Sequence, residues 1–227
     1  AGRRGLPEEP HRKRRKGATD MSKIITIGRE FGSGGRELGR RLSEKLGYAY
    51  YDQEIVTEIA KRTKLSEEYV ERITEDRPYM AYPVHAGMSF HTAYYAYTEF
   101  DRSLTVFAEQ HNIIKELAER SDCVIVGRCA DYILKEKDPF RIFVYADAES
   151  KLKRCRERSP EEENLSDSKI RRNIRSIDKG RARYYNYFSQ QKWGARENYD
   201  LLINTSGKDV KQVSEAVADY LKRYLFE

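Results

Sequence analysis

A glycine-rich segment near the beginning of the 227-residue chain constrains its fold more than any other feature. The β-branched run at residues 23–28 predicts a short buried strand, and leucines at helical spacing predict a helix over residues 36–46. Between them stands Gly32-Ser33-Gly34-Gly35. This glycine spacing lets successive main-chain amides converge on one anion, and the helix N-terminus adds partial positive charge. The segment predicts an anion-binding loop; a merely flexible strand-to-helix turn is the alternative.

The loop departs from the phosphate-binding consensus G-x-x-x-x-G-K-[ST]. When Gly34 is aligned with the second consensus glycine, Gly35 stands at the lysine and Arg36 at the serine or threonine. The lysine that reaches the β- and γ-phosphates and the hydroxyl that binds Mg²⁺ are therefore both missing. Arg29 or Arg36 could supply the cation, and Ser33 could help to bind phosphate. We expect phosphate affinity to survive this change, whereas efficient phosphoryl transfer is an open question.

Strands and helices alternate along the rest of the chain. Further buried strands are predicted over residues 48–51, 123–127, 141–146 and 199–204. Helices are predicted over residues 54–64, 66–73, 103–120, 130–135, 149–158, 167–185 and 210–224. Residues 77–100 are rich in aromatic side chains without a clear period, so we expect an irregular segment there. The alternation predicts an α/β fold with a parallel sheet covered on both faces, and ligands beyond the carboxyl ends of its strands.

The net charge of +6 is concentrated in two segments. Residues 1–20 carry seven basic and three acidic side chains, and residues 151–183 carry twelve basic and six acidic ones. This pattern favours a compact anionic ligand over a long polyanion, so nucleic acid is not the expected partner. Residues 1–20 are predicted to be a disordered basic leader, with contact to nucleic acid as the alternative. Residues 21–227 are expected to form one domain.

Hydropathy and cysteine content narrow the class of protein further. No apolar run approaches the roughly 20 residues of a membrane span. The three cysteines match neither a zinc spacing nor a disulfide framework. We therefore expect a cytoplasmic protein without a membrane partner. The sequence assigns no oligomeric state.

Four short motifs follow one another along the chain: residues 25–37, Tyr51-Asp52, residues 124–131 and residues 199–206. Together they resemble the motifs of the cytidylate kinase-like family, bacterial relatives of CMP kinase in the nucleoside monophosphate kinase group. The resemblance spans about residues 23–227. It implies a P-loop NTPase fold with a five-stranded parallel sheet flanked by helices. It also implies an acceptor (NMP)-binding insertion at residues 77–107 and an Arg-rich helical lid at residues 151–183.

The resemblance also implies where a phosphoryl acceptor binds. Gly127 and Arg128 match a Gly-Arg-Asp motif that helps CMP kinases to hold the substrate nucleotide; Cys129 replaces the Asp, and Asp131 is the nearest carboxylate. Residues 178–181 look similar to a later Asp-x-x-Arg that reads cytosine and its phosphate. The Arg expected four residues before it is Ile174 here, with Arg175 as the nearest substitute. The acceptor-binding candidates are Arg128, Asp131, Arg175, Asp178 and Arg181.

Phosphoryl transfer asks a protein mainly for position and positive charge, which the arginine fork supplies well. The candidates for binding ATP and its phosphates are Arg29, Gly32, Ser33, Gly34, Gly35 and Arg36. The catalytic candidates are Arg36, Asp52, Arg154 and Arg158, the last two in the lid. Asp52 could order a Mg²⁺-bound water or accept a substrate hydroxyl; a cap for the following helix is the alternative. Metal ligands are not assigned.

These observations predict an ATP-dependent phosphotransferase that uses Mg²⁺ and acts on a nucleoside monophosphate, with CMP or dCMP first. A kinase of another small metabolite is the second hypothesis. A non-catalytic nucleotide-binding sensor is the third, because the loop lacks the lysine and the hydroxyl of the consensus. A nucleic-acid-binding module is the fourth and rests on the basic leader alone.

Overall fold

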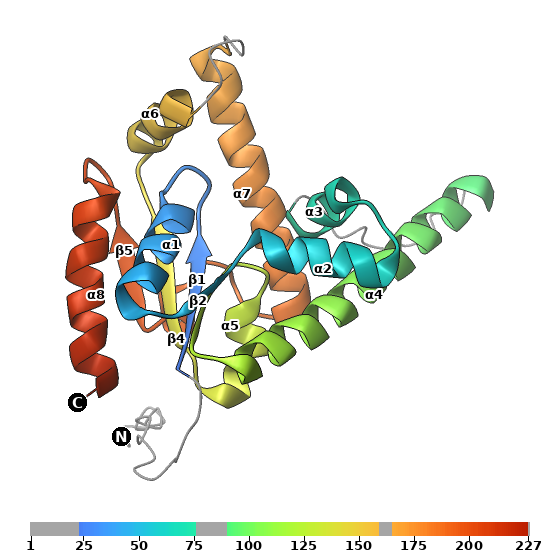
Figure 1. The fold of residues 1–227 in the computed structure, drawn as a ribbon. Helices are drawn as coiled ribbons and strands as arrows, with labels where there is room; N and C mark the ends of the chain where they lie inside the picture. Colours follow the sequence, from blue (N-terminus) through green and yellow to red (C-terminus); the bar gives the residue numbers. More distant parts are fainter. Residues whose placement is uncertain (1–22, 76–89, 159–164, 227) are drawn as a thin grey trace, which may run out of the picture.

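The fold is built around one parallel sheet at the centre of the molecule (Figure 1). The computed structural model describes residues 23–75, 90–158 and 165–226. Five strands run in the order β2-β3-β1-β4-β5. They are β1 (Ile24–Arg29), β2 (Ala49–Tyr51), β3 (Cys123–Val126), β4 (Phe140–Tyr145) and β5 (Leu201–Asn204). Strand β1 pairs in parallel with β3 and β4, so its carboxyl end lies at the middle of one sheet edge. The predicted five-stranded parallel sheet is confirmed.

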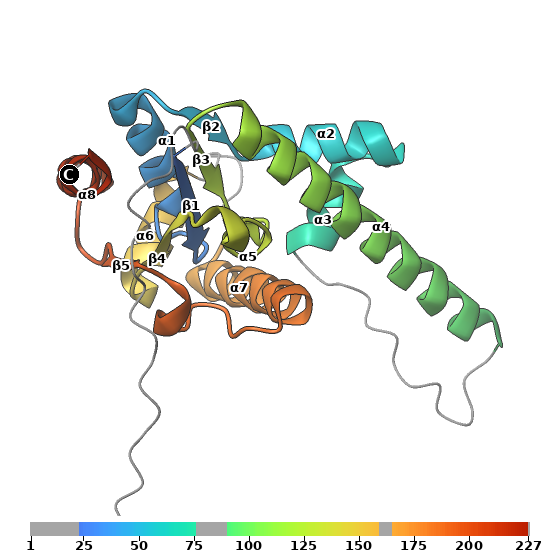
Figure 2. The ribbon, with the colours of Figure 1, turned by 90° about the horizontal axis from the view of Figure 1, so that it is seen from below.

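Helices cover both faces of the sheet (Figure 2). They are α1 (Gly35–Leu46), α2 (Gln53–Thr63), α3 (Glu67–Glu75), α4 (Phe90–Arg120), α5 (Ala130–Ile133), α6 (Ala148–Arg158), α7 (Asp167–Ser189) and α8 (Val210–Phe226), with the 3₁₀ turns η1 (Lys135–Lys137) and η2 (Arg196–Asn198). Within these described residues, no helix combines the length and the apolar character needed to cross a bilayer.

Alternation along the strands divides the core into two layers. Ile25 and Ile27 of β1 face α1 and α8, where they pack with Leu38 and Leu221. Ile24 faces the opposite layer, which α2, α4, α5 and α7 complete. Because each strand is buried on both faces, the sheet can be made from nearly continuous apolar runs.

One predicted element is wrong. Residues 90–100, expected to be irregular, form the first part of the long helix α4. Packing against α7 explains why: Phe107 stacks on Phe188 with ring centroids 3.9 Å apart, and Phe100 meets Tyr187 edge-on. The many aromatic residues of this segment obscure the helical period in the sequence. Some of them form an interface between α4 and α7. Residues 1–22 and 76–89, which hold the leader and the start of the insertion, lie outside the described residues.

Candidate active site

The glycine loop, residues 30–34, joins β1 to α1 at the carboxyl edge of the sheet. Gly32 and Gly34 have φ angles of 75° and 84°, in the region that side chains disfavour. Gly34 also lies against α8, since a β-carbon on it would stand 2.6 Å from Val210. Backbone conformation and close packing together hold the loop in one shape at this edge.

Three main-chain amides at the loop are available to a ligand. Four others donate within the protein: Glu30 to the Val144 carbonyl, Phe31 to the Asp178 carboxylate, Ser33 to the Glu30 carbonyl and Gly35 to the Ser33 hydroxyl. Those of Gly32, Gly34 and Arg36 donate no hydrogen bond to any residue that the structure describes. These amides lie at the N-terminal end of α1, where the helix dipole favours an anion.

A cleft of about 470 Å³ opens in front of the glycine loop, between the loop and helices α6 and α7. We call it the arginine cleft, because its wall carries Arg29, Arg36, Arg154, Arg158 and Arg181. Apolar side chains of α7, Ile170 and Ile177, complete the wall. This combination suits a ligand that carries several negative charges together with an apolar part.

Two of these arginines come from α6 and are held by different partners. Arg154 donates to the Thr205 carbonyl at 2.6 Å and to the Gly32 carbonyl at 3.4 Å, so it ties the glycine loop to the segment after β5. Burial lowers the pKa of its guanidinium. Arg158 forms an ion pair with Glu37 in the first turn of α1. Both arginines therefore join α6 to the sheet side of the cleft.

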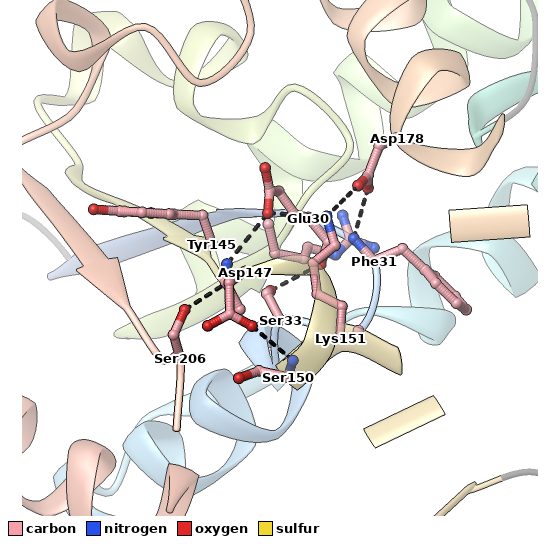
Figure 3. A network of polar contacts seen from close by, with 12 residues as sticks. Glu30, Phe31, Ser33, Tyr145, Asp147, Ser150, Lys151, Asp178 and Ser206 are labelled. Atoms are coloured by element: carbon pink, nitrogen blue, oxygen red, sulfur yellow. Dashed lines mark hydrogen bonds and ion pairs between the residues drawn. The ribbon is translucent and has the colours of Figure 1, made fainter. Parts of the chain in front are cut away.

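A polar network anchors the loop to α6 and α7 (Figure 3). The ammonium group of Lys151 lies 3.0 Å from Glu30 Oε2 and 2.7 Å from Asp178 Oδ2. The other oxygen of Asp178 accepts from the Phe31 amide at 2.6 Å. Burial acts to lower the pKa of Lys151, but the two carboxylates outweigh burial and raise it. Asp178, predicted to bind the acceptor, is thus engaged in holding the loop.

Asp52 lies at the end of β2 and is only 3% exposed. Its Oδ2 is 2.5 Å from Arg36 Nε, and its Oδ1 is 3.9 Å from a guanidinium nitrogen of Arg29. Its side chain makes no capping bond to α2, so the capping alternative does not describe this conformation. Asp52 instead brings together the two arginines that flank the glycine loop.

A second, smaller cavity of about 30 Å³ lies behind the loop, among β1, β3, α3 and α7. We call it the inner cavity; Arg128, Asp131, Tyr185 and Tyr199 are on its wall. The Tyr185 hydroxyl donates to Asp131 at 2.8 Å. Burial raises the pKa of Asp131, although this hydrogen bond acts in the opposite direction. In this conformation the inner cavity has room for water-sized groups alone, so a larger acceptor requires its wall to move.

The structure does not bring every predicted residue to these cavities. Arg175 is exposed on α7 and is on the wall of neither cavity. Ser33 is fully buried; its hydroxyl donates to the Glu30 carbonyl at 2.8 Å and stabilises the loop from within. Every other predicted site residue lines the arginine cleft, the inner cavity or both, or contacts a residue that lines one of them.

Sequence reasoning missed two buried polar residues that support Arg128. Gln110 of α4 is fully buried; its amide donates to the Arg128 carbonyl at 2.9 Å and accepts from Tyr184. The Thr74 hydroxyl contacts the Arg128 guanidinium directly. Gln110 stands on the buried face of its helix, and a polar residue on an otherwise apolar stripe is the signal that could have identified it.

No group of three His, Cys, Asp or Glu side chains that could hold a metal ion occurs among the residues that the structure describes. Asp52 Oδ1 is a buried carboxylate oxygen that accepts no hydrogen bond from them. A divalent cation that arrives bound to a ligand's phosphates fits this donor set better than a metal held by protein side chains alone.

Comparison with known proteins adds to this geometry. The sequence matches the model of the cytidylate kinase-like family over residues 24–207. None of the curated proteins matches it. A crystal structure of an uncharacterized protein from Eubacterium ventriosum ATCC 27560 superposes with a TM-score of 0.63 at 26% identity and covers 88% of this chain and 99% of that one.

Two shikimate kinases are also similar in structure. The enzyme from Bacteroides thetaiotaomicron has a TM-score of 0.53 at 16% identity and covers 90% of this chain and 99% of its own. The enzyme from Acinetobacter baumannii, in complex with shikimate, has a TM-score of 0.50 at 17% identity, with 90% and 93% covered. These neighbours show a P-loop kinase fold. With the family match over residues 24–207, the chain belongs to the cytidylate kinase-like family.

Proposed function

We propose that the protein is an ATP-dependent phosphotransferase that phosphorylates a small acceptor. The observation that carries this proposal is the arginine cleft, which stands over the available amides of the glycine loop. Phosphoryl transfer depends on position and on stabilising the charge of the phosphate oxygens, and this cleft supplies cations from four elements: β1, α1, α6 and α7. Family membership and the P-loop kinase fold support the same class of reaction.

The triphosphate would lie on the glycine loop, with the amides of Gly32 and Gly34 on its oxygens. Arg36 and Arg158, which both lie on the wall of the arginine cleft, would contact it. Arg154, which already ties the loop to Thr205, would keep the lid segment over the nucleotide and exclude water. Arginine suits this site because its fork grips two phosphate oxygens and stays ionised.

Mg²⁺ would enter with the phosphates of the nucleotide. When bound, it neutralises the developing charge on their oxygens. Asp52 is the residue that would hold it, through its Oδ1. The alternative role that we propose for the same carboxylate, with an acceptor that reacts through a hydroxyl, is to accept the proton of that hydroxyl.

We place the acceptor at the inner cavity, with Arg128 as its principal contact and with Asp131 and Arg181 beside it. A nucleoside monophosphate, CMP or dCMP first, is the acceptor that the family resemblance favours. Another small metabolite is the second candidate, because the inner cavity is small and because Cys129 and Ile174 depart from the cytosine-reading pattern.

A turnover assay tests the proposal. ADP formation from ATP and Mg²⁺ is measured with a panel of nucleoside monophosphates and small hydroxylated metabolites, and we expect one acceptor to stimulate it. Arg128→Met should raise the KM for that acceptor about tenfold or more, the usual cost of a lost charged hydrogen bond, and leave the KM for ATP unchanged. Arg175→Met is the matched control, because Arg175 is an exposed arginine on the wall of neither cavity.

The missing lysine and hydroxyl of the loop favour one second candidate, a nucleotide sensor without turnover. Tight ATP binding by calorimetry, with no ADP formed at any Mg²⁺ concentration, would select the sensor. The absence of both binding and turnover would overturn both functions.

A further inference from the structure

The phosphate-binding loop of this chain lacks its lysine, and the structure points to the residue that takes its place. We propose that Arg29 is the catalytic cation that binds the transferring phosphoryl group, and that Gly35 is a glycine because residue 29 carries a side chain. The inference rests on the proposed function and names the residue that stabilises the transferring phosphoryl group.

The first observation is the contact between Arg29 and the consensus lysine position. A β-carbon placed on Gly35 would lie 2.5 Å from the β-carbon of Arg29 and 3.1 Å from its γ-carbon. Real β-carbons do not approach other atoms so closely, so no side chain fits at residue 35 while Arg29 is present. With Gly34 at the second consensus glycine, Arg29 stands at the first. The arginine at the end of β1 and the glycine at the lysine position are therefore one coupled exchange.

The second observation is how the Arg29 head group is held. Arg29 is 7% exposed, and a β-carbon on Gly127 would overlap its guanidinium. One nitrogen of the head group is 3.9 Å from Asp52 Oδ1. The absence of a side chain at two positions, Gly35 and Gly127, thus makes room for one buried arginine whose charge is fixed next to a carboxylate. Burial of such a charge is costly unless it is compensated, and Asp52 supplies compensation and keeps the head group in place beside the loop.

The third observation is the position of Arg29 between the two cavities. Among the residues that line the arginine cleft and the inner cavity, Arg29 and Arg181 alone are common to both. Arg181 donates to the Arg29 carbonyl at 3.4 Å and lies over the Phe31 ring. A phosphoryl group that passes from a donor in one cavity to an acceptor in the other must cross this shared wall.

Arg36, the other candidate for the missing cation, does not have this position. Its side chain is 56% exposed, and its Nε is 2.5 Å from Asp52 Oδ2. Arg36 lines the arginine cleft but not the inner cavity. Arg36 can bind the donor phosphates, but Arg29 is placed at the point of transfer.

The transfer itself uses no covalent chemistry of Arg29. The bond between the γ-phosphorus and the bridging oxygen of ADP breaks, and a bond from that phosphorus to an acceptor oxygen forms. A hydroxyl acceptor gives its proton to Asp52, whereas an ionised phosphate acceptor has none to give. Arg29 keeps its proton and binds two of the three oxygens that carry the charge.

A residue exchange tests the proposal. Arg29→Met, which keeps an apolar stem over Gly35, should lower kcat for ADP formation about 100-fold to 1000-fold, as the loss of one charge-stabilising donor does in other enzymes. The double variant R29G/G35K moves the cation to the consensus position and should regain at least about tenfold over Arg29→Gly, because the room vacated by Arg29 admits the lysine. Arg40→Ala is the matched control, since Arg40 is an exposed arginine on the same helix as Gly35.

A binding measurement accompanies the kinetics and does not depend on turnover. Arg29→Met should abolish the preference for ATP over ADP in calorimetry and leave ADP affinity nearly unchanged. If the wild type forms ADP and Arg29→Met keeps kcat and the ATP preference within threefold, the proposal is wrong. If the wild type neither turns over nor binds nucleotide, the proposed function has failed. Circular dichroism of each variant separates unfolding from loss of charge, and Arg29→Lys, with an intermediate kcat expected, replaces any variant that does not fold.

Discussion

Asp131 is a buried acid whose environment acts against its charge. The residue is 9% exposed, and burial raises the pKa of its carboxyl group although Tyr185 donates to it. A raised pKa in the folded state means that folding favours the protonated carboxyl group. The associated stability is present below the pKa of the unfolded chain and is lost as the pH rises through the folded pKa.

The first prediction follows from this loss of stability at higher pH. Asp131→Asn keeps an oxygen that can accept from Tyr185 but has no charge to bury, so the variant should gain stability over the wild type as the pH rises. Urea unfolding across a pH series measures the difference in the free energy of unfolding. Two parallel curves would show that Asp131 does not titrate in the buried state assigned to it here.

A second residue-scale prediction concerns Gln110. Gln110→Leu removes the donor to the Arg128 carbonyl and leaves that buried oxygen without it, which should cost about 1–3 kcal/mol of stability. The KM for the acceptor should also rise, because Gln110 positions the segment that carries Arg128. Asn112→Leu, at an exposed position on the same helix, is the control and should change neither quantity. Equal effects of both variants would remove Gln110 from the site.

At the scale of elements, helices α6 and α7 are joined to the glycine loop by specific bonds. Lys151 of α6 bridges Glu30 of the loop and Asp178 of α7, and Asp178 holds the Phe31 amide. A displacement of α6 or α7 must therefore disturb the loop, and a ligand on the loop must act on the helices. This is a physical connection between the cleft and the segment that covers it.

The third prediction breaks that connection. Lys151→Met leaves two carboxylates near each other without their cation, which should cost about 2–3 kcal/mol; the full cost of breaking a buried ion pair is larger, but Glu30 and Asp178 keep some contact with water. The Phe31 amide should exchange with solvent faster. Lys153→Met is the control, because Lys153 is an exposed lysine of α6. Wild-type stability in Lys151→Met would show that the network does not anchor the loop.

For the whole molecule, the arginine cleft brings five arginines together at one sheet edge. The fourth prediction is that affinity falls in the order ATP, ADP, AMP and that raising the ionic strength weakens ATP binding about tenfold between low and physiological salt. Calorimetry at several salt concentrations measures this, with adenosine as the uncharged control. Salt-independent ATP binding would place the triphosphate away from the cleft.

Three expectations about the whole molecule remain predictions. Cys123, Cys129 and Cys155 are free thiols. The cytoplasmic location inferred from cysteine usage remains a prediction. The role of the basic leader and the acceptor-binding role of residues 77–107 also remain predictions; the leader and residues 77–89 lie outside the described ranges.

The sequence alone determined the features that neighbouring residues encode. The alternation of apolar strands and amphipathic helices predicted the five-stranded parallel sheet, and the glycines after β1 predicted where the loop lies. The tertiary structure alone decided which distant residues meet: Arg29 with Gly35 and Gly127, Asp52 with Arg36, and the aromatic face of α4 with α7. The reason is physical, because periodicity and turn chemistry act over a few residues, whereas packing and ion pairing join residues that become neighbours through folding alone.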